Sequence, residues 1–108
     1  MVKRSLPKNV TKEIHDFIRA LEADHLPITS VIVFGSYAKG TAHRWSDIDV
    51  CVVSPRFRDP WNAMHYLWSK RLHDSGLTIE PIGLRPADLR QKNELTNEIK
   101  RSGIVFRQ

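Results

Sequence analysis

The chain of 108 residues has a single cysteine, Cys51, and contains no long run of apolar residues. One cysteine cannot form a disulfide within the chain, which favours a reducing compartment. The first ten residues lack the apolar segment of a signal peptide, and no stretch approaches the roughly 20 apolar residues that cross a bilayer. We therefore expect a soluble protein of the cytoplasm that makes no membrane contact.

Acidic residues are fewer than basic ones, with 12 Asp and Glu against 17 Lys and Arg, for a formal net charge of +5. This modest excess suits a polyphosphate ligand, but many unrelated proteins carry as much positive charge. The 41% apolar and 27% charged composition is ordinary for a globular chain. At this length we expect one domain that spans residues 1–108 and has its own core.

Hydrophobic periodicity predicts alternating helices and strands. Apolar residues from Val10 to Leu21 follow helical spacing, and Asn9 is a candidate N-cap for this first helix. Asp59 and Pro60 form a favourable helix start, with the C-terminal cap expected at Gly76. Other expected elements are strands at 30–34, 48–53, 77–84 and 104–106, a helical turn at 37–39 and a helix at 86–100.

This order of elements predicts an α+β (α/β two-layer) fold, in which helices pack mainly on one face of a small mixed β-sheet. Pro81 limits the third strand to an edge of the sheet or to a short pairing, because proline cannot donate to a ladder. In the helix that follows Asp59, an apolar stripe is predicted to pack into the core. Its members are Trp61, Met64, Trp68 and Leu72.

The segment VIVFGSYAKGTAHRWSDIDVCVVS, from Val31 to Ser54, places two carboxylates at the start of an apolar strand. Strand side chains alternate between faces, so Asp47 and Asp49 project to one side and Ile48 to the other. Two neighbouring carboxylates repel each other unless a cation lies between them. Hard oxygen ligands of this kind suit Mg²⁺, which also takes ligands from substrate phosphates.

The turn after the preceding strand has the residue types that bind phosphate. Gly35 allows the backbone to approach a phosphate closely, Ser36 supplies a hydroxyl, and Lys39 supplies a positive charge one turn later. The alternative interpretation is a plain Gly-Ser turn beside a solvated strand end. Together, the two halves of the segment are typical of a Mg²⁺–triphosphate site.

The stretch GSYAKGTAHRWSDIDV resembles the signature of the polymerase-β-like nucleotidyltransferase superfamily. The short chain is similar to the minimal nucleotidyltransferases that act as antitoxins beside HEPN-domain toxins. This resemblance implies the nucleotidyltransferase fold and the transfer of AMP from ATP to a hydroxyl with two Mg²⁺ ions. It further implies that Gly35 and Ser36 bind the β- and γ-phosphates and that Asp47 and Asp49 bridge the metals.

The resemblance also implies a third carboxylate on a later strand. Glu80 is the only acid of the expected third strand, and it is longer than the aspartate that the family more often has there. We therefore name Glu80 as the third catalytic and metal-binding residue. An edge-strand charge without a catalytic role is the alternative.

Three functions follow, from different classes. In the first, the chain is an antitoxin that transfers AMP to a tyrosine of a HEPN-domain toxin. In the second, it binds nucleotide and neutralises its partner with little or no catalysis. In the third, it modifies a small molecule or a nucleic acid alone, which we rank last because no acceptor site is evident. We expect no nucleic acid as a direct ligand, and a homodimer or hetero-oligomer is compatible with the sequence.

Overall fold

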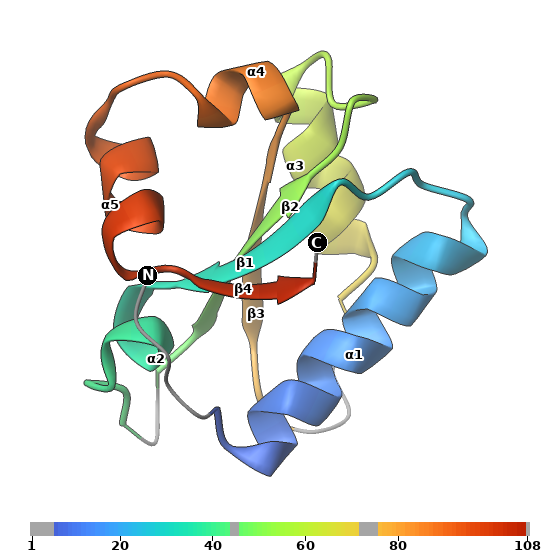
Figure 1. Ribbon diagram of the computed structural model, residues 1–108. Coiled ribbons are helices and arrows are strands. Elements are labelled where there is room, and N and C mark those ends of the chain that lie inside the picture. The colour runs from blue at the N-terminus through green and yellow to red at the C-terminus, as the bar shows by residue number, and fades with distance from the viewer. Residues whose placement is uncertain (1–5, 44–45, 72–75, 108) are drawn as a thin grey trace.

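The computed structural model describes residues 6–43, 46–71 and 76–107. Its helices and strands follow the predicted order, with one additional helix near the C-terminus (Figure 1). The elements are α1 (Lys8–Ala23), β1 (Ser30–Phe34), α2 (Gly35–Lys39), β2 (Ile48–Val53), α3 (Pro60–Ser69), β3 (Ile79–Leu84), α4 (Pro86–Leu89), α5 (Glu94–Ser102) and β4 (Ile104–Arg107). None of the helices in these ranges has the length and hydropathy to cross a membrane.

The four strands form one mixed sheet in the order β3-β2-β1-β4. β1 pairs antiparallel with both β2 and β4, whereas β2 pairs parallel with β3. β3 is therefore an edge strand, which confirms the expectation from Pro81. The mixed sheet with its helices confirms the predicted fold class.

One face of the sheet is covered by the two longest helices, α1 and α3. Val31, Val33 and Val50 point to this face and are almost completely buried. The apolar stripe of α1 and residues Ala63 and Leu67 of α3 complete this core. Because β1 and β2 are covered on both sides, they read as continuous apolar runs rather than as alternating patterns.

The opposite face carries a smaller core. Ile99 of α5 packs there with Ile32, Phe34 and Cys51, and α4 and α5 lie on the side of the sheet away from α1 and α3 (Figure 1). Burial raises the pKa of the Cys51 thiol to about 12, so the thiol stays protonated and packs as a small apolar group. Cys51 is therefore an inert thiol of this core.

Several predicted boundaries are wrong by a few residues. α1 begins at Lys8 after Pro7, and the side chain of Asn9 bonds only the next backbone N–H instead of capping the helix. α3 does begin with the predicted cap, because Asp59 accepts from two backbone N–H groups. It ends at Ser69, however, and not at Gly76. The predicted core residue Leu72 lies outside the described ranges.

The single helix expected over 86–100 is two helices, and this prediction is wrong for a local reason. Asn93 accepts from the Thr96 N–H, and the Thr96 hydroxyl accepts from the Asn93 N–H, which is a reciprocal cap at the start of α5. The buried Thr96 hydroxyl also donates to the Gln91 carbonyl. These bonds hold the chain in a non-helical bend between α4 and α5.

The tryptophans of α3 also correct a prediction. Trp61 is 62% exposed and Trp68 is 40% exposed, so neither belongs to the core in which their helical spacing placed them. α3 buries Ala63 and Leu67 instead. The periodicity was that of a helix, but the side of the helix that faces the sheet is lined by its smaller residues.

Candidate functional site

Three carboxylates meet at one end of the parallel strand pair. Asp47 directly precedes β2, Asp49 is its second residue, and Glu80 is the second residue of β3. Asp49 and Glu80 are register partners across the two strands. Register partners in a sheet project to the same face, so the side chains of Asp49 and Glu80 are neighbours. As predicted, Ile48 is turned to the opposite face, where it is fully buried.

The electrostatics of this cluster favour neutralisation. Burial and then the negative charge of Asp47 raise the pKa of Asp49. A hydrogen bond with Asp47, followed by burial, raises the pKa of Glu80. Burial and the charge of Asp47 act on both groups, because adjacent carboxylates in a partly desolvated place repel each other when all are ionised. A proton or a cation between them would relieve the repulsion.

Gly35 lies directly against Asp49. Its φ is +73°, in the left-handed region, and a Cβ at this position would overlap the Asp49 carboxylate. Glycine is therefore required here for two independent reasons, the backbone conformation and the space. The Gly-Ser turn and the strand that carries the aspartates, separated in the sequence, thus lie against each other at one place in the fold.

The helical turn of α2 places the next two predicted residues. Ser36 is half-buried, and its carbonyl accepts from the backbone N–H groups of Gly40 and Thr41, which closes the turn. Lys39 is exposed and forms an ion pair with Glu98 of α5, with 2.9 Å between Nζ and Oε1. Lys39 therefore stands near the site, but its charge is engaged with a carboxylate in this structure.

Glu98 is the site residue that the sequence reasoning missed. Its negative charge contributes to the raised pKa of Asp49, and the positive charge of Lys39 acts in the opposite direction. Nothing in the local sequence marks Glu98, because its place depends on how α5 folds back over the second face of the sheet. Glu98 could have been identified only by knowing that Lys39 forms an ion pair with an acid about sixty residues later in the chain.

The donors of this cluster fit a divalent cation by their chemistry, since all are carboxylate oxygens. As the side chains stand, no three acidic, histidine or cysteine groups of the described residues converge as metal ligands. Asp47, Asp49 and Glu80 interact instead with one another. The structure thus brings the three predicted residues together without fixing them in a coordination sphere.

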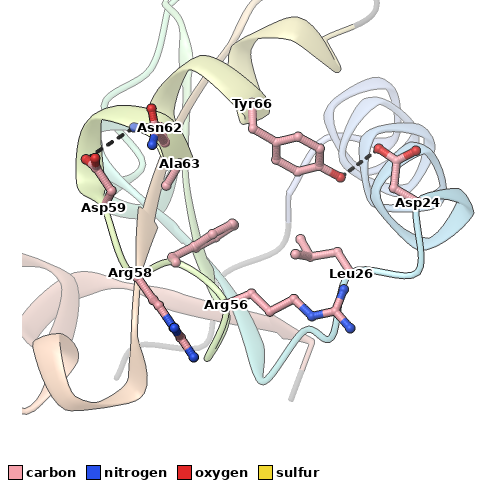
Figure 2. Close-up of a pocket in the computed structure, with 9 residues that line it drawn as sticks. Asp24, Leu26, Arg56, Arg58, Asp59, Asn62, Ala63 and Tyr66 are labelled. Atoms are coloured by element: carbon pink, nitrogen blue, oxygen red, sulfur yellow. Dashed lines mark hydrogen bonds between the residues drawn. The ribbon is translucent and has the colours of Figure 1, made fainter.

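A cavity of about 350 Å³ lies elsewhere, between α1, α3 and the loop after β2 (Figure 2). Tyr66 donates to Asp24 at its wall, and Arg56 and Arg58 lie at its lower rim. Because β2 starts at the carboxylates and ends near this cavity, the two places lie at opposite ends of the strand. None of the predicted site residues lines the cavity.

Comparison with known proteins agrees with this geometry. The profile of a family described as "Nucleotidyltransferase domain" matches residues 13–105. The chain belongs to this nucleotidyltransferase domain family. The matched range includes α2, both strands that carry the carboxylates and nearly all of the remaining fold.

A curated relative supports the same assignment. A Methanocaldococcus jannaschii protein named "Putative protein adenylyltransferase" is 36% identical over 70 residues. The aligned stretch covers 61% of this chain and 48% of the relative, so the chain spans about half the length of that protein.

Two solved structures share the fold. A "putative nucleotidyltransferase from Sulfolobus solfataricus" matches with a TM-score of 0.57 at 18% identity, over 97% of this chain and 91% of the other. A structure described as "the toxin-antitoxin with AMP-PNP" matches with a TM-score of 0.54 at 25% identity, over 92% of this chain and 72% of the other. The nucleotidyltransferase fold predicted from the sequence is confirmed.

Proposed function

We propose that this nucleotidyltransferase domain transfers AMP from ATP to a tyrosine hydroxyl of a HEPN-domain toxin and thereby acts as its antitoxin. The observation that carries the proposal is the convergence of Gly35, Asp49 and Glu80. The phosphate turn lies against one carboxylate, and that carboxylate is in register with the next. The relative named as a protein adenylyltransferase and the toxin–antitoxin neighbour with AMP-PNP support the nucleotide and the class of acceptor.

In this proposal Gly35 and Ser36 hold the β- and γ-phosphates through backbone N–H groups and the Ser36 hydroxyl. Asp47, Asp49 and Glu80 would hold two Mg²⁺ ions, which supply positive charge to the attacking and leaving oxygens when bound. Lys39, once released from Glu98, would contribute a point charge to the phosphates. Glu80 is exposed at the sheet edge, so its side chain can change rotamer to complete the site.

The reaction is an in-line displacement at the α-phosphorus of ATP. The acceptor oxygen forms the new P–O bond, the bond from the α-phosphorus to the bridging oxygen breaks, and pyrophosphate leaves. The hydroxyl proton passes to a carboxylate of the site or to water.

A second candidate function is a nucleotide-binding antitoxin with little or no catalysis. Two observations favour it: no three described side chains converge as metal ligands, and Lys39 is paired with Glu98. In this case ATP would bind but AMP would stay attached to pyrophosphate. A pure binder would neutralise its partner even without Asp47 and Asp49.

The experiment that tests the proposal is co-expression with the protein encoded next to this chain, followed by addition of Mg²⁺ and labelled ATP. We expect label from the α-phosphate, and none from the γ-phosphate, on a tyrosine of the partner. Asp47→Asn with Asp49→Asn should abolish labelling, whereas the surface change Asp16→Asn should not. A stably bound partner that acquires no α-label would refute the transferase and leave the binder.

A further inference from the structure

The solvent-facing side of α3 presents an aromatic surface that the fold does not use. Trp61, His65 and Trp68 follow one another at helical spacing, and the two tryptophans are the most exposed large apolar side chains of the described residues. Met64, His65 and Trp68 line a small hollow of about 120 Å³. Ala63 and Leu67 of α3 are buried toward the sheet instead, and Tyr66 points toward Asp24 (Figure 2). We refer to Trp61, Met64, His65, Trp68 and the adjacent Arg71 as the α3 surface.

The side chains of the α3 surface are held in place before any partner binds. The Trp61 and His65 rings meet edge to face, with centroids 4.6 Å apart. The Trp68 indole N–H donates to the Pro81 carbonyl at 3.2 Å, and the Arg71 guanidinium lies 4.1 Å from the Trp68 ring. Groups that are already ordered lose little entropy on binding, which is why such arrangements bind well.

The α3 surface also reaches the candidate site. Arg71 donates to the Ile79 carbonyl and Trp68 to the Pro81 carbonyl, and these two residues flank Glu80 in the edge strand. In Figure 1, α3 lies along the outer part of the sheet near β3. A molecule on the α3 surface would therefore lie beside the sheet edge that carries Glu80. The same two bonds occupy edge carbonyls that another strand would need for pairing.

We propose that the α3 surface docks the acceptor protein, through a contact patch on that protein that is apolar and rimmed by carboxylates. Tryptophan and arginine are enriched among the residues that contribute most of the binding energy at protein interfaces, and the α3 surface carries both. α3 itself carries no acidic residue, and Arg71 forms no ion pair with a described carboxylate. An acidic rim therefore complements it. This inference rests on the proposed function, because it assumes a macromolecular acceptor.

Two other occupants fit the α3 surface less well. A second copy would bring together two chains of net charge +5, and pairing along β3 is obstructed by the bonds from Trp68 and Arg71. An RNA strand needs several phosphate contacts from Lys or Arg, but the α3 surface offers one such side chain, Arg71. A protein with an apolar patch rimmed by carboxylates is the occupant that the charge and the exposed tryptophans favour.

The test begins with a photo-reactive amino acid in place of His65, and in a second variant in place of Leu95, which is 38% exposed on α5. We expect the variant at 65, but not the one at 95, to crosslink in the native host to a different protein. That protein, once purified, should bind the chain with an affinity that falls as salt rises. Trp61→Ser should weaken binding by about tenfold or more, and Leu95→Ser by less than about twofold.

Crosslinking only to a second copy, to RNA or to nothing would overturn the proposal, and so would equal effects of Trp61→Ser and Leu95→Ser. Transfer of AMP separates this inference from the proposed function. Binding through Trp61 without any AMP transfer would leave docking intact and refute the transferase. If AMP is transferred and Trp61→Ser leaves the KM for the partner unchanged, the transferase stands and docking through the α3 surface is refuted. The variant with Asp47→Asn and Asp49→Asn should bind the partner normally and transfer nothing.

Discussion

At the scale of single residues, the site depends on how closely Gly35 approaches Asp49. The sequence suggested glycine for access to phosphate, and the structure adds a reason that the sequence could not show, which is the space taken by the Asp49 side chain. The pairing of Asp49 with Glu80 was likewise expected only from a resemblance, because register between parallel strands is set by tertiary packing. Residue types were predictable here, but contacts were not.

Gly35→Ala should cost about 3 kcal/mol of unfolding free energy, because it adds left-handed strain and an overlap with Asp49. Gly76→Ala is the matched control, since Gly76 also has a positive φ, of +80°, but no atom of the described residues lies within 4 Å of the added methyl. It should cost about 1 kcal/mol. Urea unfolding of both variants checks this. If both variants lose the same free energy of unfolding, the contact with Asp49 does not contribute to the cost of Gly35→Ala.

Asp49→Asn should raise the melting temperature of the metal-free protein at neutral pH. The substitution removes one of several mutually repelling carboxylates from a partly buried place. Mg²⁺ should stabilise the original chain and leave the variant nearly unchanged, because the cation would relieve the repulsion that the variant lacks. Differential scanning calorimetry with and without Mg²⁺ is the measurement. A variant less stable than the original chain in the absence of metal would contradict this account.

At the scale of helices and strands, β1 and β2 were predicted to the residue because their apolar runs are flanked by glycine, aspartate and proline. The break between α4 and α5 was missed, since it comes from a reciprocal bond between Asn93 and Thr96 that propensity does not reveal. The tryptophans of α3 were misplaced for a different reason. Helical spacing defines a stripe, but only packing decides which stripe faces the sheet.

The ion pair that joins α2 to α5 allows a test of Lys39. Lys39→Met should weaken binding of Mg²⁺–ATP about tenfold if the lysine contacts phosphate, while the folding free energy changes by less than about 1 kcal/mol, as exposed pairs do. Glu98→Gln is the companion variant, and it should preserve or strengthen binding because it frees Lys39. Isothermal titration calorimetry measures both affinities. Unchanged binding by Lys39→Met would remove this residue from the site.

The contact between the end of α1 and α3 predicts a pH dependence. Hydrogen bonds from Lys70 and then Tyr66 lower the pKa of Asp24 below its ordinary value. A lowered folded-state pKa means that this contribution to stability is present above the unfolded pKa of 3.8 and is lost as pH falls through the folded value. Asp24→Asn should therefore be less stable than the original chain at pH 7. The difference should vanish in strong acid.

Thermal unfolding from pH 7 down to about pH 2 checks this prediction. Asp59→Asn is a suitable comparison, because Asp59 also lies at the cavity but caps α3 and has no cationic partner among the described residues. A gap between Asp24→Asn and the original chain that stays constant over the whole range would show that the ionisation of Asp24 does not stabilise the contact.

At the scale of the whole molecule, charge and composition indicated only a globular chain with a mild preference for anions. The fold class followed from the order of helices and strands and the family from one stretch of sequence, and the match over residues 13–105 agrees with both. The surface that we propose for the partner was not predictable, since its tryptophans, Trp61 and Trp68, were assigned to the core from their helical spacing. One sheet face thus carries the candidate site, and a helix that covers the other face carries the surface for docking.

The most direct test of this account is the binding of AMP-PNP to the purified chain, measured by calorimetry with Mg²⁺ and with EDTA. We predict binding that requires Mg²⁺, that is lost in the variant with Asp47→Asn and Asp49→Asn, and that survives Trp61→Ser. Binding of equal strength in EDTA, or in the double aspartate variant, would contradict the claim that the Gly-Ser turn and the carboxylates form one Mg²⁺–nucleotide site.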